Sequence, residues 1–203
     1  GKSIKQQKIK NPSNLKHFSV KEAVLPFDRF QKVDPILGPE MKSTGEVMGI
    51  GTSFAEAYDK SQISAGTIIP DGGSVFLSVR ENDKPHLKEL ATRLDQLNIS
   101  IVATKGTARI IQSMGIEVRI INKVAEGRPH VVDLIKNNEI SLLINTTEGK
   151  ESIKDSSSIR RTALDNKLPC TTTLQGGLAI CEVLEKRLDW SVQNIQDIHK
   201  NIE

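Results

Sequence analysis

From Ser74 onward, short β-rich runs alternate with helical segments, and this alternation constrains the fold more than any other feature. The β-rich runs are 75–79, 99–103, 116–121, 140–144 and 169–173, and the helical segments are 84–97, 107–114, 130–136, 156–166 and 174–187. Strands that alternate with helices of this length predict a parallel sheet with helices on both faces. The run over 140–144 is apolar at nearly every position, which is typical of a strand buried on both sides.

The expected helices carry ordinary boundary signals. One face of the segment over 84–97 is apolar and consists of Leu87, Leu90, Ala91 and Leu94. Asp83 is the expected N-cap of that helix, and either Asp155 or Ser156 is the expected cap of the helix that follows at 156–166. Gly115 is the expected C-terminal cap of the helix over 107–114.

Residues 1–60 differ from the rest of the chain. They contain four of the eight prolines and four of the five phenylalanines, with few strongly periodic segments. A helix is expected over 53–61, from the spacing of its apolar residues. We interpret 1–60 as a short α+β piece of another domain with little apolar surface of its own. Residues 61–73 form a linker rich in glycine and proline, and 74–203 form the α/β domain.

Composition excludes several classes of function. The 28 basic and 25 acidic residues give a net charge of +3, and the charges are mixed along the chain, so we expect no nucleic-acid partner. No apolar run approaches the ~20 residues of a membrane span, and the start has no signal core and no initiator Met, which suggests a cut from a longer protein. Cys170 and Cys181 lack metal-ligand spacing, so we expect a cytoplasmic, reduced protein in which both are buried.

Polar residues follow the expected strands where each strand ends. They lie in the segments 78–84, 104–108, 122–123 and 145–149. The carboxyl ends of parallel strands meet at one edge of a sheet, and ligands bind there. The Thr-Lys-Gly-Thr turn at 104–107 leads into a helix, whose first backbone N–H groups favour a phosphate. Ordinary helix capping by Ser, Thr and Asn is the alternative for each turn taken alone.

Signals for catalysis or metal binding are weaker. His130 is the best candidate acid or base, and it shares a helix face with Asp133, but two such groups do not make a metal site. The glycines do not form a dinucleotide-binding fingerprint, and no phosphate-binding P-loop or nucleophile elbow is present. We therefore assign no catalytic residue and no metal ligand.

Two motifs in residues 1–60 resemble the carbamoyl-phosphate synthetase large-subunit family. They are SVKEAVLPF at 19–27 and VDPILGPEMKSTGEVMG at 33–49, and they are similar to the end of its second ATP-grasp unit. The segments SVRENDK, TKGTA, NKVAEGRPH, INTTEG and SSSIRRTAL are similar to the C-terminal regulatory domain of that subunit. The resemblance implies a methylglyoxal-synthase-like domain, which has a Rossmann-type parallel sheet flanked by helices.

The resemblance also implies effector sites. A nucleotide such as UMP or IMP would bind through Ser78, Lys84, Thr104, Thr107, Lys123, Asn145, Thr147 and Asp155, with Asp155 on the ribose. Ornithine would bind through Glu22 and Thr172, because a carboxylate suits its ammonium groups. Two departures affect these expectations: Lys105 stands where relatives often have His, and Cys170 stands where some relatives have Tyr.

The resemblance implies a parent enzyme that makes carbamoyl phosphate with ATP and Mg²⁺ (or Mn²⁺), for arginine and pyrimidine biosynthesis. Its partners would be a glutaminase small subunit and other large subunits. We expect no cofactor in this segment and no activity from it alone. Three alternatives remain: a methylglyoxal synthase, the cyclohydrolase domain of purine synthesis, and an oligomerisation module.

Overall fold

The computed structural model describes residues 1–7, 15–24, 45–146, 156–187, 190 and 192–200. Its centre is a five-stranded parallel sheet of strands β3 (Ser74–Ser78), β4 (Ser100–Thr104), β5 (Arg119–Ile121), β6 (Leu142–Asn145) and β7 (Cys170–Thr171). The strand order is β5-β4-β3-β6-β7, so β3 lies at the centre. The chain first moves outward through β4 and β5 and then returns to the other side of β3, which makes the β3/β6 boundary the topological switch point.

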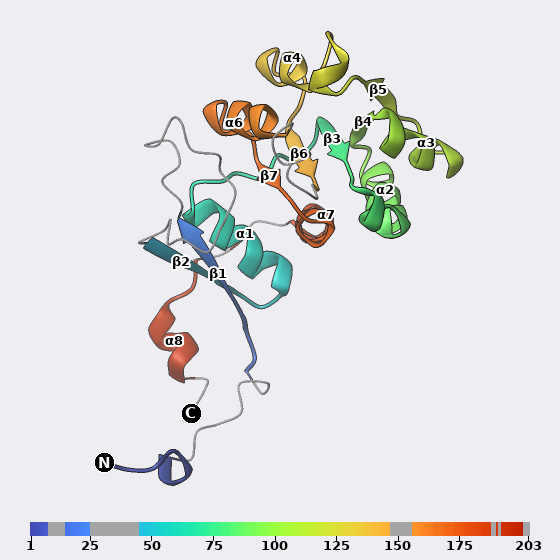
Figure 1. Ribbon diagram of the computed structural model, residues 1–203. Coiled ribbons are helices and arrows are strands. Elements are labelled where there is room, and N and C mark those ends of the chain that lie inside the picture. The colour runs from blue at the N-terminus through green and yellow to red at the C-terminus, as the bar shows by residue number, and fades with distance from the viewer. Residues whose placement is uncertain (8–14, 25–44, 147–155, 188–189, 191, 201–203) are drawn as a thin grey trace.

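Helices cover both faces of the sheet, as predicted (Figure 1). One face carries α2 (Leu87–Gln96), α3 (Lys105–Ser113) and α7 (Leu174–Lys186), and the other carries α4 (Val131–Lys136) and α6 (Ser157–Asp165). The strands alternate between two apolar clusters: Val75 and Leu77 face α2 and α7, whereas Phe76 faces α4 and α6. This period of two is what a strand buried on both sides requires.

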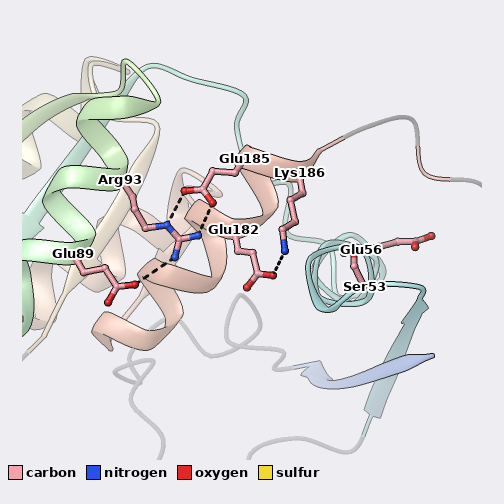
Figure 2. Close-up of polar contacts among 7 residues, drawn as sticks. All are labelled: Ser53, Glu56, Glu89, Arg93, Glu182, Glu185 and Lys186. Atoms are coloured by element: carbon pink, nitrogen blue, oxygen red, sulfur yellow. Dashed lines mark hydrogen bonds and ion pairs between the residues drawn. The ribbon is translucent and has the colours of Figure 1, made fainter. Parts of the chain in front are cut away.

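Helix α7 lies close to the sheet because Gly177 has no side chain. A Cβ at Gly177 would lie 2.9 Å from Ile144 Cδ1 and 3.2 Å from the methyl carbons of Leu90. Figure 2 shows a second link at the same helix pair, where Arg93 on α2 donates to both carboxylate oxygens of Glu185 on α7, at 2.7 and 2.6 Å. Glu89, one turn earlier on α2, adds an ion pair to Arg93 at 3.8 Å.

Most of the predicted helix and strand boundaries are confirmed within a few residues. Gly115 follows α3 with a φ of +78°, as a C-terminal glycine cap should. The prediction for Asp83 is wrong: a 3-10 helix, η4, begins at Glu81 and runs to His86 before α2 starts. Asp83 lies inside η4, and its carboxylate accepts hydrogen bonds from the Arg80 guanidinium at 2.8 and 3.1 Å. The ion pair thus holds the carboxylate that would otherwise cap the helix.

The first part of the chain forms a small antiparallel hairpin and one helix. The hairpin consists of β1 (Phe18–Val24) and β2 (Gly45–Gly51), and α1 (Phe54–Ser64) packs on it. The contact is between backbones, since a Cβ at Gly49 would lie 2.0 Å from the Ala57 carbonyl oxygen. Ser53 caps α1 by accepting from the Glu56 amide at 3.2 Å. A 3-10 turn, η1 (Ile4–Gln7), precedes the hairpin, and α8 (Ile195–Lys200) ends the described chain.

Helix α1 also belongs to the core of the α/β part. Ala55 is fully buried in the same apolar cluster as α2 and α7, and α1 packs against α7. Figure 1 shows α7 beside α1, with the parallel sheet above them in this view. The expectation that residues 1–60 have little apolar surface to bury is corrected for α1. The face of α1 that carries small residues such as Ala55 is buried against α7. The exact boundaries at 60 and 73 remain a prediction.

A charged cluster joins α1 to the end of α7, and we name it the Asp59 cluster. Asp59 of α1 is buried, and it accepts from Arg187 Nη2 at 2.7 Å and from Trp190 Nε1 at 2.6 Å. Arg187 Nη1 donates to the carbonyl of Ile69 at 2.8 Å and to Asp71 Oδ1 at 2.6 Å. Burial alone would lower the pKa of Arg187, but the two carboxylates outweigh it and raise that pKa. The cluster thus ties three distant segments together.

The two cysteines differ from each other. Cys181 is buried on α7, as predicted, and burial raises the pKa of its thiol to about 11. Cys170 is exposed as a residue in β7, contrary to the expectation, but its thiol is desolvated, and this burial raises the pKa of the thiol to about 11. It lies on an edge strand of only two residues, which leaves one side of the strand uncovered.

Candidate functional site

Three of the predicted site residues end neighbouring strands at the switch point. Ser78 ends β3 and is the register partner of Asn145, which ends β6. Thr104 ends β4 on the other side of β3, and its hydroxyl lies 3.5 Å from that of Ser78. The topology therefore brings Ser78, Thr104 and Asn145 to one edge of the sheet, as the strand pattern predicted.

The first turn of α3 begins at the same edge. Thr104 stands at the N-cap position without a side-chain cap bond, and Lys105 begins the helix. The first N–H groups of a helix have no partner within it and carry the positive end of its dipole. Helix α3 therefore presents hydrogen-bond donors and positive potential where β3 and β4 end.

Thr107 makes a hydrogen bond within the fold, in addition to any role in ligand binding. Its side chain is buried, and its Oγ1 accepts from the Val79 amide at 3.0 Å, which fixes the start of α3 to the end of β3. The hydroxyl proton is not used in that bond. Replacing Thr107 would therefore disturb the fold as well as any ligand contact.

Lys84 lies over the first turn of α3. Its side chain is 17% exposed, and its Nζ lies 3.3 Å from the place where a Cβ would stand at Gly106. Glycine at 106 thus leaves the space that the ammonium group occupies. Lys84 also donates to the carboxylate of Glu81, one turn earlier in η4.

The side-chain amide of Asn145 is a buried donor that is unsatisfied within the described residues. The residue is 1% exposed, and its Nδ2 has no hydrogen-bond partner in the part of the chain that the structure describes. A buried donor without a partner costs about 1–3 kcal/mol, so such groups are normally satisfied by water or a ligand. The amide lies at the switch point beside Ser78, where an acceptor oxygen would satisfy it.

Thr146 belongs to the site, although sequence reasoning did not select it. It is buried, accepts from the Arg80 amide at 2.9 Å, and donates its own backbone N–H to the Ser78 carbonyl, also at 2.9 Å. These bonds hold the loops after β3 and β6 together. A Thr directly after a buried strand was the available signal, but its neighbour Thr147 was selected instead. Thr147 and Asp155 lie outside the described residues.

Lys105 and Lys123 lie at the rim of the site and are exposed. Lys105 Nζ lies 3.8 Å from Glu126 Oε2, and the same oxygen accepts from the Lys123 amide at 3.1 Å. Because its side chain is in solvent, Lys123 offers a weaker charge contact than a buried lysine would.

His130 has a structural position at the start of α4. Its amide donates to Asp133 Oδ2 at 3.0 Å, and its Nδ1 lies 3.2 Å from the same atom. The Arg128 guanidinium and the His130 amide together lower the pKa of Asp133 to about 2. The Asp133 carboxylate is thus used at the start of α4, whereas the buried His130 Nδ1 makes no hydrogen bond within the described residues.

The two predicted ornithine residues lie on different elements. Glu22 is half-buried in β1, and its Oε2 accepts from Gln62 Nε2 of α1 at 2.9 Å. Thr172 is exposed directly after β7. Burial raises the pKa of Tyr58, and the nearby Glu22 carboxylate adds to that shift. The ornithine assignment stays a prediction.

Some kinds of site have no support in the described ranges. Residues 1–7, 15–24, 45–146, 156–187, 190 and 192–200 contain no group of three His, Cys, Asp or Glu side chains able to hold a metal ion. Within those same ranges, every helix is too short or too polar to cross a bilayer.

Comparison with known proteins gives the same class of domain. Residues 86–172 match the family model described as the MGS-like domain, so the chain carries an MGS-like domain, with the parallel α/β sheet expected of it. Along its length the chain is also homologous to proteins named carbamoyl phosphate synthase large chain. The predicted MGS-like domain and the predicted resemblance to the carbamoyl-phosphate synthetase large subunit are both confirmed.

Individual relatives define how far the similarity extends. The Pseudomonas aeruginosa carbamoyl phosphate synthase large chain is 59% identical over 186 residues, which cover 92% of this chain and 17% of that protein. The Pseudomonas putida protein of the same name is 53% identical over 203 residues, covering 100% of this chain and 19% of its own length. The Vibrio parahaemolyticus protein is 46% identical over the same 203 residues, or 19% of its length. The chain thus spans less than a fifth of these relatives.

Proposed function

We propose that this chain is the effector-binding regulatory region of a carbamoyl phosphate synthase large chain, and that the phosphate group of a nucleotide such as UMP or IMP binds where β3, β4 and β6 end. The observation that carries the proposal is the buried Asn145 amide, whose Nδ2 has no hydrogen-bond partner among the described residues. It ends β6 beside Ser78, while Lys84 lies over the first turn of α3.

Each of these groups suits a phosphate oxygen. The Asn145 Nδ2 and the first N–H groups of α3 are donors, the hydroxyls of Ser78 and Thr104 can donate as well, and the Lys84 ammonium supplies a positive charge. Limited exposure strengthens the charge contact of Lys84, because water screens it less. Lys123, Thr147 and Asp155 complete the proposed nucleotide site, with Asp155 toward the ribose.

The parent activity belongs to the proposal as well. Carbamoyl phosphate synthesis from ATP with Mg²⁺, for arginine and pyrimidine biosynthesis, would be performed elsewhere in the large chain, together with a glutaminase small subunit. This region would act on it by linkage, since an effector that binds one state more tightly shifts the whole protein toward that state. Ornithine is the second proposed effector, bound by Glu22 and Thr172.

The test is calorimetric titration of the chain with UMP, IMP and ornithine in turn, for the natural sequence and for Lys84→Ala. We expect saturable nucleotide binding that Lys84→Ala weakens by about tenfold or more, since a hydrogen bond to a charged group contributes about 1.5–3 kcal/mol. Lys88→Ala is the matched control, because Lys88 is exposed on α2 one turn later. Equal weakening by both variants, or no nucleotide binding by the folded natural chain, would contradict the proposal.

A methylglyoxal synthase would need a carboxylate positioned to remove a proton. The carboxylates of Glu81 and Asp83, which follow β3, are both in ion pairs, with Lys84 and Arg80 respectively. An assay with dihydroxyacetone phosphate would distinguish this enzyme from a binding domain, and we expect no turnover.

A further inference from the structure

One ion pair at the proposed site joins two very differently exposed side chains. Lys84 is 17% exposed, whereas its partner Glu81 is 84% exposed. The lysine is therefore held in place by its surroundings, and the glutamate reaches it from solvent. Both residues belong to η4, three positions apart, so they can pair without any change of fold.

The carboxylate of Glu81 is bound to the ammonium group that lies over the first turn of α3. Lys84 Nζ is 3.3 Å from the Cβ position of Gly106, the second residue of that helix. A negative group at this place has the same electrostatic surroundings that a bound phosphate would have. The buried Asn145 amide, which has no partner within the part of the chain that the structure describes, points independently to an acceptor at the same edge.

We infer that Glu81 is an internal competitor of the effector phosphate: its carboxylate holds Lys84 when no nucleotide is bound, and the phosphate displaces it on binding. This inference rests on the proposed function and assigns Glu81 a regulatory role there. An exposed ion pair contributes little, so displacement is easy, and a phosphate of charge near −2 pairs with Lys84 more strongly than a carboxylate does. Glu81 thus lowers the affinity for phosphorylated ligands and leaves the affinity for neutral nucleosides unchanged.

The test compares Glu81→Gln with Glu89→Gln by calorimetric titration with inorganic phosphate, UMP and uridine at low ionic strength. Glu89 is an exposed glutamate on α2 that pairs with Arg93 instead, so both variants change the net charge equally. We expect Glu81→Gln to bind phosphate and UMP about two- to fivefold more tightly than Glu89→Gln, the range that the loss of an exposed ion pair permits. Uridine binding should not differ between them.

Further variants separate the possible results. In a Lys84→Ala background, Glu81→Gln should have no effect, because the two residues act through one contact. Binding by Glu81→Gln that equals or falls below that of Glu89→Gln would overturn the inference while leaving the proposed function intact. Absence of phosphate and UMP binding in every variant would overturn both.

Discussion

Replacing Arg187 by Ala should destabilise the chain far more than a surface arginine would. The change removes the hydrogen bond and ion pair to Asp59, whose side chain is 2% exposed, and leaves a buried carboxylate. Removing one partner of a buried ion pair costs about 3–5 kcal/mol. Because Trp190 Nε1 still donates to Asp59 at 2.6 Å, we place the loss in the free energy of unfolding at about 2–4 kcal/mol.

The single tryptophan of the chain makes this measurable, since Trp190 itself contacts Asp59. Urea unfolding followed by tryptophan fluorescence reports on the Asp59 cluster, and circular dichroism reports on the helices. Arg93→Ala is the control: it removes a paired bond to Glu185 of similar length (Figure 2), but Glu185 is 34% exposed whereas Asp59 is 2% exposed, so the loss should be about 1 kcal/mol or less. Equal losses for the two variants would refute the reasoning, because they would mean that water satisfies Asp59.

Three further predictions follow from packing and charge. Gly49→Ala should cost about 1–3 kcal/mol and loosen the hairpin, since its Cβ would lie 2.0 Å from the Ala57 carbonyl oxygen; hydrogen exchange of β1 would show this. Leu90→Ala should cost about 2–5 kcal/mol in urea unfolding, because the side chain is fully buried. The pKa of Asp133 is depressed from 3.8 to about 2, so its stabilising contribution is complete above about pH 4 and is lost as pH falls toward 2. In Arg128→Ala that part of the pH dependence of unfolding should shrink, and an unchanged pH profile would contradict the assignment.

The sequence was sufficient for the α/β part because its signals are local. Each strand is a run of apolar residues between turns, and the four apolar residues of α2 share one face at helical spacing. The first hairpin was missed for a related reason: β2 contains three glycines, Gly45, Gly49 and Gly51, and glycine is rare in strands. The glycines of β2 allow α1 to approach its backbone closely, and the local sequence carries no signal for that contact.

The candidate site was predictable in its location but not in its details. Ser78, Thr104 and Asn145 follow from the rule that parallel strands end at one edge. The sequence does not state that Thr107 already bonds Val79, that Lys84 pairs with Glu81, or that the Asn145 amide finds no partner in the described ranges. These facts depend on how side chains meet in space. Lys84 and Glu81 are 3 residues apart, and Val79 and Thr107 are 28 residues apart, so only the folded structure supplies the contacts.

Helix α7 has one consequence for the evolution of such chains. It packs against α1, whose Ala55 lies in the core that α7 shares with α2 and the sheet. A relative that kept the sheet and α7 but lacked α1 would leave the α1-facing side of α7 exposed, and it would persist only where another element covered that side.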